Sequence, residues 1–345
     1  MREKETTIHD VAREAGVSIA TVSRALSGGP VSVAAREKVE AAIRTVGYTV
    51  PGGKGNARTI AVVINSQSNP YYASMCQGVT EEAARAGYLP VFYSYPEGTK
   101  CDQAVSDLLA ARPAGVLLAG WMVENEELDQ TRSCLQRLQQ AMPLVAIGPP
   151  VDGLECARLT SDPSQCVRKS LAHLAMLGHK RIAFVGGDRT ARFSNIRERT
   201  YLEEAERLGL TLRPDYVRLT GCTAPAGELG INMLLGGLGR SEYPTAVFCI
   251  NDLTALGAMR QLHRLGLRVP EDMAVVGCDN TFFAPFLTPS LTTVDLHPRA
   301  HGKAAVAELI ASIQRGRAIS FNDNVEASLV VRESCGAHLG VRDLG

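Results

Sequence analysis

The stretch from Ser18 to Leu26 combines a helix cap, an inward apolar face and an outward arginine. Ser18 can cap a helix that runs to Leu26, which leaves the amino end of that helix exposed. When Val22 and Leu26 point inward, the side chains left outside are those of Ile19, Ala20, Thr21, Ser23 and Arg24. Arg24 follows Ala20 on the same face and can reach O6 and N7 of a guanine, a contact worth roughly 1–3 kcal/mol of discrimination. The pattern predicts a helix that reads base edges in the major groove of DNA.

Hydroxyl groups around this helix fit a second kind of contact. Thr7, Ser18 and Thr21 carry hydroxyls of the kind that hold a protein on DNA phosphates without reading sequence. The alternative interpretation is a three-helix scaffold whose exposed polar residues are only solvated. A turn glycine, a serine cap and an outward arginine at helix-turn-helix spacing favour the DNA-binding interpretation.

Three short helices are expected to position these residues. They lie over about 8–15, 18–26 and 32–47, and Gly16 suits the first turn, where a positive φ is needed. The third helix carries one apolar stripe, formed by Val39, Ala42, Ile43 and Val46. We therefore expect residues 1–48 to form a small all-α head with one shared core.

The chain changes character after the head. Residues 49–58, TVPGGKGNAR, contain three glycines and a proline without apolar periodicity, and predict a linker. Beyond it, short apolar runs alternate with amphipathic segments, which is typical of parallel sheets covered by helices on both faces. The expected strands lie at 60–64, 89–93, 115–119, 144–147, 182–185, 216–219, 246–250, 273–276 and 291–294.

These strands are too many for one comfortable sheet. The predicted fold class is therefore a small all-α helix-turn-helix head plus an α/β core of two doubly wound lobes, with the core spanning residues 59–345. In open α/β sheets a ligand binds at the carboxyl ends of the strands. A cleft between the two lobes would collect those ends from both sides.

Composition indicates which cellular compartment and which kinds of partner are expected. Lys plus Arg and Asp plus Glu number 36 each among 345 residues, but residues 1–58 hold nine basic against six acidic side chains. A mildly basic amino end is a hint of nucleic acid. The nine cysteines are scattered without a C-x-x-C pair, which argues against a disulfide framework or a zinc module and favours a reducing compartment. Without a signal peptide after MREKETTIHD or a long apolar run, we expect a cytoplasmic protein with no membrane partner.

Several motifs together resemble one protein family. TTIHDVAREAGVSIATVSRALSG, followed by VSVAAREKVEAAIRTVGY, closely resembles the head of the LacI/GalR family of bacterial transcription regulators. The family's core signatures are matched in order by NPYYASMCQGVTEEAARAGY, HLAMLGHKRIAFVGG, CINDLTALGAMRQLHRLGLRVPEDMAVVGCDN, LTPSLTTV and LVVRESCGA. The resemblance covers nearly the whole chain. It implies a core like that of periplasmic sugar-binding proteins, with three crossover strands, a small-molecule effector in the cleft, and a homodimer that reads a near-palindromic operator in double-stranded DNA.

The resemblance also implies DNA contacts for particular residues. The family's base-reading positions fall on Ile19, Ala20 and Arg24, and its phosphate-contacting positions fall on Ser18, Thr21 and Ser32. Thr7 and His9 match further positions that touch DNA. For His9 the alternative is a partly exposed histidine that only packs on the first helix.

Five core residues match effector-binding positions of the family. Arg197 matches an arginine that clamps effector oxygens, a task that suits its planar fork of donors. Asn251 and Asp279 match polar positions that bind hydroxyls or amines, and Tyr71 and Tyr72 line the first loop of the cleft. Each also has a structural alternative, since Asn251 could hold only the strand-to-helix turn, and Asp252 is expected to cap the helix that follows. The effector stays open between a sugar, a nucleoside and another small molecule.

The sequence departs from the family pattern in two places. Ten residues separate Tyr48 from Thr59, fewer than is usual, and they lack the leucine that a hinge helix inserts into the minor groove. Three glycines disfavour such a helix, so the central kink of the operator is in doubt. At Thr223 the family often carries an aromatic residue, so the effector class cannot be inherited.

The predicted function is a sequence-specific DNA-binding transcription regulator of the repressor type, controlled by the effector and bound to the nucleoid when active. The alternative is a cytosolic ligand sensor whose shortened linker impairs DNA binding. An enzyme is disfavoured, because the first strand is not followed by G-x-G-x-x-G and the chain contains neither G-x-x-x-x-G-K-[ST] nor G-x-S-x-G. We expect no catalytic residue, metal site or cofactor, and we expect His173 and His179 at the surface or as helix caps.

Overall fold

The computed structural model of the chain describes residues 7–26, 31–46, 58–65, 68–95, 99–124, 128–148, 151, 153–160, 162–315 and 322–339. The chain divides into two compact units, Met1–Gly55 and Asn56–Gly345. Apart from Arg58, the expected linker lies outside the described residues.

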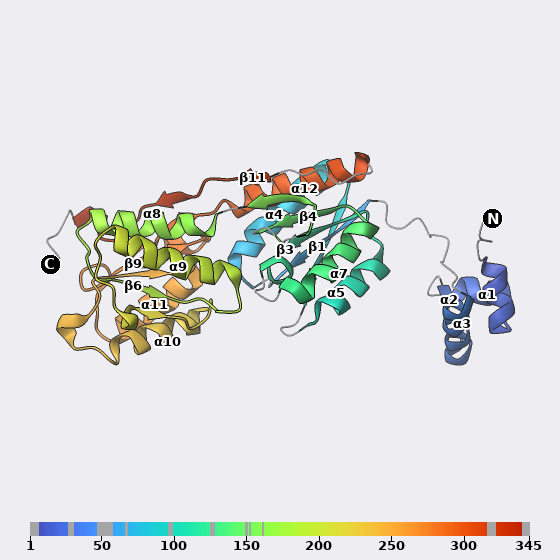
Figure 1. Cartoon of the computed structure of the whole chain (residues 1–345), viewed down its shortest axis with the longest axis horizontal. Helices are drawn as coiled ribbons and strands as arrows, with labels where there is room; N and C mark the ends of the chain where they lie inside the picture. Colours follow the sequence, from blue (N-terminus) through green and yellow to red (C-terminus); the bar gives the residue numbers. More distant parts are fainter. Residues whose placement is uncertain are drawn as a thin grey trace. The chain divides into compact units, whose positions relative to one another are not determined.

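The first unit is a bundle of three short helices (Figure 1). They are α1 (Ile8–Ala15), α2 (Ile19–Leu26) and α3 (Val33–Val46), at the predicted places. Val11, Val22 and Val39 meet in its centre with almost no exposed surface. Gly16 ends α1 with φ of 63°, and the backbone N–H of Val17 closes the turn on the carbonyl of Ala12 at 3.2 Å. The predicted positive φ is confirmed, and it sets the angle at which α2 leaves α1.

The second unit begins with an amino-terminal lobe built on a parallel sheet of order β11-β5-β4-β3-β1-β2. Its strands are β1 (Thr59–Ile64), β2 (Leu89–Ser94), β3 (Gly115–Ala119), β4 (Leu144–Ile147), β5 (Ala157–Thr160) and β11 (Asn322–Asn324). Its helices are α4 (Pro70–Arg85), α5 (Cys101–Ala111), α6 (Trp121–Glu124), α7 (Leu128–Ala141) and α12 (Pro298–Arg315). Alternate residues of β1 face opposite cores, one under α4 and α12 and the other under α5 and α7.

The carboxy-terminal lobe repeats this plan with the order β12-β10-β9-β8-β6-β7. Its strands are β6 (Ile182–Val185), β7 (Val217–Arg218), β8 (Ala246–Cys249), β9 (Ala274–Cys278), β10 (Thr292–Asp295) and β12 (Ser328–Val330). Its helices are α8 (Pro163–Met176), α9 (Arg192–Arg207), α10 (Ala224–Leu235) and α11 (Asp252–Arg264). Short 3₁₀ turns lie at Pro214–Tyr216, Arg240–Glu242, Ala284–Phe286 and Ala337–Leu339. α8 and α9 cover one face of the sheet, and α10 and α11 cover the other.

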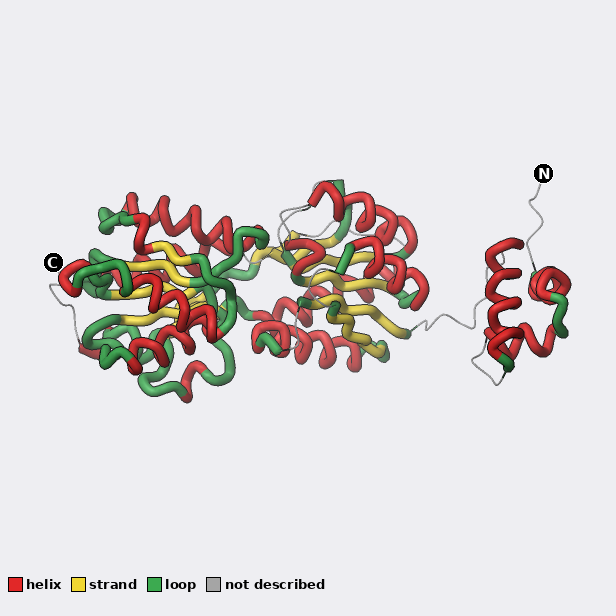
Figure 2. The backbone as a smooth tube through the Cα atoms, turned by 90° about the horizontal axis from the view of Figure 1, so that it is seen from below, coloured by secondary structure: helices red, strands yellow, loops and turns green. Residues whose placement is uncertain are grey.

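The chain passes between the two sheets three times, as the resemblance implies. It leaves the amino-terminal sheet after β5, returns after β10 to form α12 and β11, and crosses again to β12 (Figure 2). Among the described residues, the strand pairs are parallel except β10 with β12. The predicted class of two doubly wound lobes is thereby confirmed.

Several details of the predicted elements were wrong. Strands β5, β11 and β12 were not predicted, because their segments are short and hold few consecutive apolar residues. The strand expected at 216–219 shrinks to β7, since Pro214 starts a 3₁₀ turn that includes Tyr216. His173 and His179 are buried rather than at the surface. His173 contacts Cys335 Sγ at 3.2 Å, and His179 contacts Thr245 Oγ1 at 2.9 Å.

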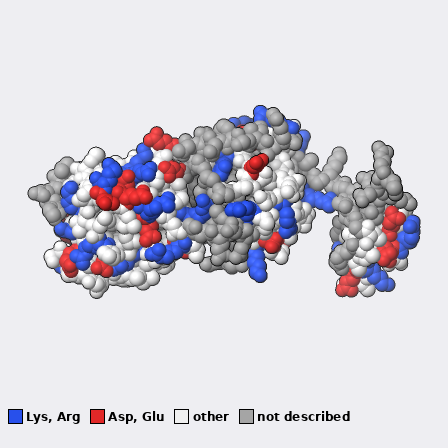
Figure 3. Space-filling model, in the orientation of Figure 1, with Lys and Arg blue, Asp and Glu red and all other residues white. Residues whose placement is uncertain are grey.

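Two surface properties complete the description. In the part of the chain that the structure covers, every helix is too short or too polar to span a bilayer. Basic and acidic side chains are interspersed over the carboxy-terminal lobe on the face drawn in Figure 3.

Candidate DNA-binding and effector sites

The amino end of α2 is held open by its own side chains. Ser18 Oγ accepts the backbone N–H of Thr21 at 3.1 Å and lies 2.9 Å from the Thr21 hydroxyl, so the predicted cap is confirmed. Ile19, Ala20 and Arg24 are exposed beside it, while Val22 is buried. The Nε–H of Arg24 donates to the carbonyl of Ala20 at 3.2 Å, which places the guanidinium over the face that Ala20 presents. The structure therefore brings the three expected base-reading residues onto one exposed surface.

The other expected DNA contacts surround this surface within the head. Thr7 caps α1, and both its N–H and its hydroxyl donate to the carboxylate of Asp10, at 2.9 and 2.7 Å. Ser32 caps α3 by accepting the N–H of Ala35 at 3.2 Å. His9 is exposed rather than packed into the core. Thr7, Ser18 and Ser32 thus all stand at amino ends of helices, where backbone N–H groups favour an anion such as a phosphate.

Arg197 is the central charge of the carboxy-terminal lobe. It projects from α9, keeps 6% of its surface exposed, and donates from Nη1 to the carbonyl of Ile250 at 2.7 Å. Its Nε is buried and has no hydrogen-bond partner among the described residues. The ring of Phe193 lies 5.3 Å from the guanidinium carbon. A buried, incompletely satisfied guanidinium at the carboxyl ends of β6 and β8 is suited to bind acceptor atoms of a ligand.

Asn251 rather than Asp252 caps α11, in agreement with the structural alternative in which Asn251 holds the strand-to-helix turn. Asn251 is the cap of α11, because its Oδ1 accepts the N–H of Thr254 at 2.8 Å, and its Nδ2 donates to the carbonyl of Cys222. Asp252 lies inside the helix and is fully buried. Its carboxylate accepts hydrogen bonds from Thr281 and Thr293, which come from two other segments. The expectation that Asp252 caps the helix is wrong, because its carboxylate is occupied by donors from Thr281 and Thr293.

Asp279 follows β9 in the left-handed backbone region, with φ of 114°, and is 8% exposed. Burial raises its pKa well above the ordinary value, the negative charge of Asp252 raises it further, and the positive charge of Arg197 opposes both. For Arg197, burial lowers the pKa, but the nearby thiols and Asp279 raise it more, so the guanidinium stays charged. Arg197, Asn251 and Asp279 are therefore brought together at one edge of the sheet.

The two tyrosines come from the amino-terminal lobe. Asn69 caps α4 by accepting the N–H of Tyr71 at 3.0 Å, so both rings lie in the first turn. Tyr71 is half-buried and packs against core residues of both lobes. Tyr72 meets it edge-on with ring centroids 5.2 Å apart, but is itself part of the amino-terminal core. Tyr71 is thus placed toward the carboxy-terminal lobe, and Tyr72 supports it from behind.

Three groups near Arg197 were not expected from the sequence. Phe193 stacks under the guanidinium one turn earlier in α9. Cys222 and Cys278 lie near Arg197, and the negative charge of their thiolate forms raises its pKa. The spacing of Phe193 and Arg197 on one helix is a signal that the sequence offers, whereas the approach of the cysteines depends on the fold. Thr223, noted for the missing aromatic, caps α10 by accepting the N–H of Ala226 at 3.3 Å.

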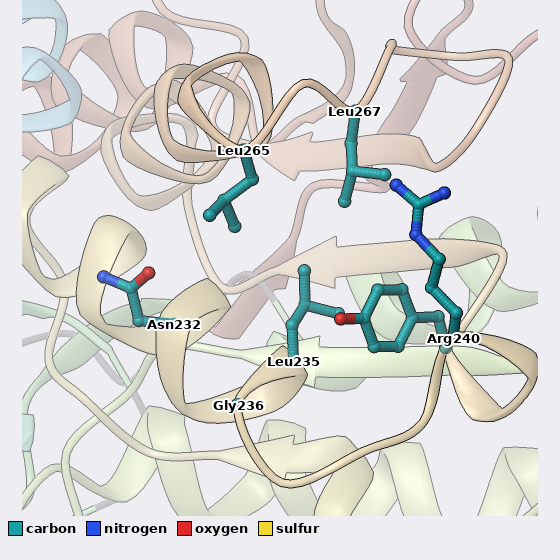
Figure 4. A pocket seen from close by; sticks show the side chains of 7 residues that line it. Asn232, Leu235, Gly236, Arg240, Leu265 and Leu267 are labelled. Atoms are coloured by element: carbon teal, nitrogen blue, oxygen red, sulfur yellow. The ribbon is translucent and has the colours of Figure 1, made fainter.

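A separate hollow of about 230 Å³ lies at the opposite edge of this sheet. It is lined by Asn232, Leu235, Gly236, Arg240, Tyr243, Leu265 and Leu267 (Figure 4). These residues stand at or beyond the carboxyl ends of α10 and α11, and helices in such folds run opposite to the strands. The hollow therefore faces the amino ends of the strands, away from Arg197. Among the described residues, no cluster of three or more His, Cys, Asp and Glu side chains is arranged to hold a metal ion.

Comparison with known proteins accounts for both units. Residues 7–50 match the family described as bacterial regulatory proteins, lacI family, and residues 171–335 match the periplasmic binding protein-like domain. The transcriptional repressor CytR of Escherichia coli strain K12 is 30% identical over 340 residues, which cover 96% of this chain and 97% of CytR. The chain belongs to the LacI family. It is a DNA-binding transcription regulator of the repressor type with an effector-binding core.

Other members of the LacI family agree along their whole length. The transcriptional regulator MalR of Streptomyces coelicolor is 30% identical over 348 residues, which cover 98% of each chain. A lac repressor dimer bound to operator and the anti-inducer ONPF superposes with a TM-score of 0.70 at 27% identity, over 96% of this chain and 99% of that one. A complex of the regulator CelR with cellobiose gives 0.69 at 27% identity, over 95% and 99%.

Proposed function

We propose that the head, residues 1–48, reads its operator through the exposed face of α2, and that residues 49–58 join it to the effector core, residues 59–345. Ile19, Ala20 and Arg24 contact base edges, while Thr7, His9, Ser18, Thr21 and Ser32 contact the backbone. The observation that carries this proposal is the geometry of α2, whose capped amino end presents Ala20 and Arg24 side by side. In this arrangement the arginine provides sequence specificity, and the hydroxyl groups position the head on the DNA backbone.

The Arg24→Ala substitution tests this proposal. A binding site is first selected from a random duplex pool with the full chain, and affinities are then measured by fluorescence anisotropy at near-physiological salt. Loss of one bidentate contact to guanine is expected to weaken binding by about 5- to 150-fold per half-site and to relax specificity at one base pair. Arg13→Ala is the matched control, because Arg13 is also an exposed arginine of the head, on α1, where it pairs with Asp10. Equal loss in both variants, or unchanged base preference after Arg24→Ala, would refute base reading by Arg24.

The proposed effector is a small molecule rich in hydroxyl or amide acceptors, such as a sugar or a nucleoside. Arg197, Asn251 and Asp279 supply donors and acceptors at one edge of the carboxy-terminal sheet, and Tyr71, supported by Tyr72, closes the site from α4. One relative was solved with cellobiose, which supports a polyhydroxylated ligand. Binding that favours one arrangement of the lobes would change operator affinity by no more than the ligand's difference in affinity between the two arrangements.

We also propose that the chain acts as a homodimer, as the lac repressor does in its complex with operator. Phe282 and Phe286 are 76% and 81% exposed after β9, Phe282 just before the 3₁₀ turn Ala284–Phe286 and Phe286 at its end, which is a large cost unless a partner covers them. The double substitution Phe282→Ser/Phe286→Ser is expected to shift the dimer to monomer in sedimentation velocity. Leu212→Ser, at an exposed leucine beyond α9, serves as the control and should leave the dimer intact. A double variant that sediments like the natural chain would remove this surface from the interface.

The proposal includes no catalytic activity, since the relatives named above are transcription regulators. A regulator that binds chromosomal operators works in the cytoplasm, on the nucleoid. The two full-length relatives and the exposed α2 favour this function over that of a ligand sensor without DNA binding.

A further inference from the structure

Backbone strain among the described residues gathers at one corner of the carboxy-terminal lobe. Four of these residues other than glycine have a positive φ, and three of the four lie just beyond the neighbouring strands β9 and β10. Asp279 and Asn280, with φ of 114° and 50°, form the turn that follows β9, here called the β9 turn. His297, with φ of 54°, directly precedes α12. Such residues persist only where the surrounding structure holds them, and they gather at functional sites.

The side chain of Asn280 holds the β9 turn from two sides. Its Nδ2 donates to Oδ2 of Asp295 at 3.0 Å, and its Oδ1 accepts a hydrogen bond from Nη2 of Arg332 at 2.7 Å. Arg332 is itself fixed, because its Nη1 donates to the carbonyl of Leu291 at 2.6 Å and its backbone N–H donates to the hydroxyl of Thr292 at 2.8 Å. Asn280 is therefore positioned by the last residue of β10 and by a residue beyond β12.

Asp295 extends these contacts to the segments that cross between the lobes. Its Oδ1 accepts the backbone N–H of His297 at 2.6 Å, in the crossover from β10 to α12. Nε2 of His297 lies 3.2 Å from the hydroxyl oxygen of Ser328, where the crossover from β11 reaches β12. The N–H of the preceding residue, Ala327, donates at 2.8 Å to Oε1 of Gln165, in the first turn of α8 after the crossover from β5. This chain of contacts thus reaches all three crossovers.

The contacts that join Asn280, Asp295, His297, Ser328 and Arg332 are here called the hinge clasp. Three residues of the hinge clasp, together with Ser74 of α4 and Lys303 of α12, border a hollow of about 440 Å³. The side of the hinge clasp toward these two helices is therefore not tightly packed. The crossover segments have space to move beside the amino-terminal lobe.

We propose that Asn280 is a positioning residue, which couples the β9 turn to the crossover segments through the hinge clasp. A change in the angle between the lobes alters the crossover backbone, which leaves β10 at Asp295 and His297. The hydrogen bond from Asn280 to Asp295 transmits this change to the β9 turn, whose strained backbone is held by its contacts rather than by its own preference. The consequence for effector binding rests on the proposed effector site at Asp279, whereas the coupling itself does not.

Hydrogen–deuterium exchange of the full chain, followed by mass spectrometry, tests this coupling. Asn280→Gly removes both side-chain contacts, while glycine accepts the positive φ without strain. Exchange at the backbone N–H of His297 should become about 10-fold faster or more, because Asp295, which accepts that N–H, loses its amide donor. Asn280→Asp keeps the acceptor for Arg332 and loses only the donor to Asp295, so it should produce the same change.

The reciprocal substitution is Ser328→Ala, which removes the contact of His297 with the third crossover. Exchange at the backbone N–H groups of Asn280 and Thr281 should become at least about 2-fold faster, although Ser328 is joined to this turn only through the hinge clasp. Ser290→Ala is the matched control, because the Ser290 hydroxyl donates to the carboxylate of Glu333 at 2.8 Å in the same lobe but outside the hinge clasp. It should leave exchange at both places unchanged.

Two results would overturn the proposal. One is a change confined to the peptide that carries the substitution, in both Asn280→Gly and Ser328→Ala, and the other is an equal change in Ser290→Ala. General loosening of the lobe is recognised separately, because it would also speed exchange in the peptides of β6 and β8, which the proposal expects to stay unchanged. The measurements use neither operator nor effector, so coupled exchange in a chain that fails to bind DNA would support the hinge clasp and refute only the proposed function.

Discussion

Replacing Asp252 by asparagine is expected to remove one pH-dependent part of the stability of the core. The carboxylate of Asp252 is fully buried and accepts hydrogen bonds from the N–H and hydroxyl of Thr281, at 2.7 and 2.9 Å, and from the hydroxyl of Thr293 at 2.5 Å. Burial raises its pKa to about 6, and these hydrogen bonds offset only part of that effect. Ionisation of Asp252 therefore lowers the stability of the folded protein relative to the unfolded chain.

The size and sign of this cost follow from the two pKa values. The ordinary value is 3.8, so the pKa rises on folding by about 2 units, or about 3 kcal/mol at 1.36 kcal/mol per unit. Because the folded pKa is the higher one, the folded state binds more protons than the unfolded state between them. The stabilisation is fully present below pH 3.8 and is lost as the pH rises through about 6.

Urea unfolding of the natural chain and of Asp252→Asn, followed by circular dichroism between about pH 4 and 7.5, measures this contribution. The free energy of unfolding of the natural chain, minus that of the variant, should fall by about 3 kcal/mol across this range. Asp272→Asn is the control, because the ion pair with Arg268 lowers the pKa of Asp272 to about 2, below the window. Parallel stability curves for the natural chain and Asp252→Asn would refute the reasoning.

Two further substitutions probe the effector site and the head. Arg197→Lys keeps the positive charge but loses the planar fork of donors. For a sugar or nucleoside first found by thermal-shift screening, calorimetric titration should show affinity weakened by about 10-fold or more, while operator binding without ligand stays unchanged. Unaltered ligand affinity would exclude Arg197 from the contact. Gly16→Ala places a side chain on a residue in the left-handed region, at φ of 63°, and should lower the free energy of unfolding of the head by about 1 kcal/mol in thermal unfolding. Gly209→Ala, at φ of 61° in the α/β core, is the control and should leave the unfolding transition of the head unchanged.

The elements that the sequence predicts well are those whose apolar pattern is both long and periodic. The three head helices are correct because apolar residues recur at helical spacing within a segment, as Val39, Ala42 and Ile43 do in α3, and the apolar faces of the three helices meet in one small core. The central strands β1, β3, β6, β8 and β9 are correct because both faces of each are buried, which gives continuous apolar runs. The fold class follows from their alternation with helices.

The edges of the sheets could not be predicted in the same way. β12 consists of Ser328–Val330 and is held by antiparallel pairing with β10, and β5 is held between β4 and β11. The stability of such short strands comes from the ladder that the neighbouring strand completes rather than from their own residues. Local pattern carries little information about pairing partners that lie tens or hundreds of residues away in the chain.

Because local pattern does not reveal tertiary partners, the sequence could propose individual site residues but not the hydrogen bonds between them. Asn251 and Asp252 have nearly equal capping preference, and only Thr281 and Thr293, brought in by other segments, decide which of them enters the helix. Arg197 is a candidate ligand contact because its buried Nε has no hydrogen-bond partner among the described residues, which the sequence alone does not reveal. Leaving such a donor unsatisfied costs about 1–3 kcal/mol, and a ligand acceptor that reaches it in only one lobe arrangement recovers that amount. A bias of this size corresponds to a change in operator affinity of about 5- to 150-fold, which is the ordinary range of allosteric coupling.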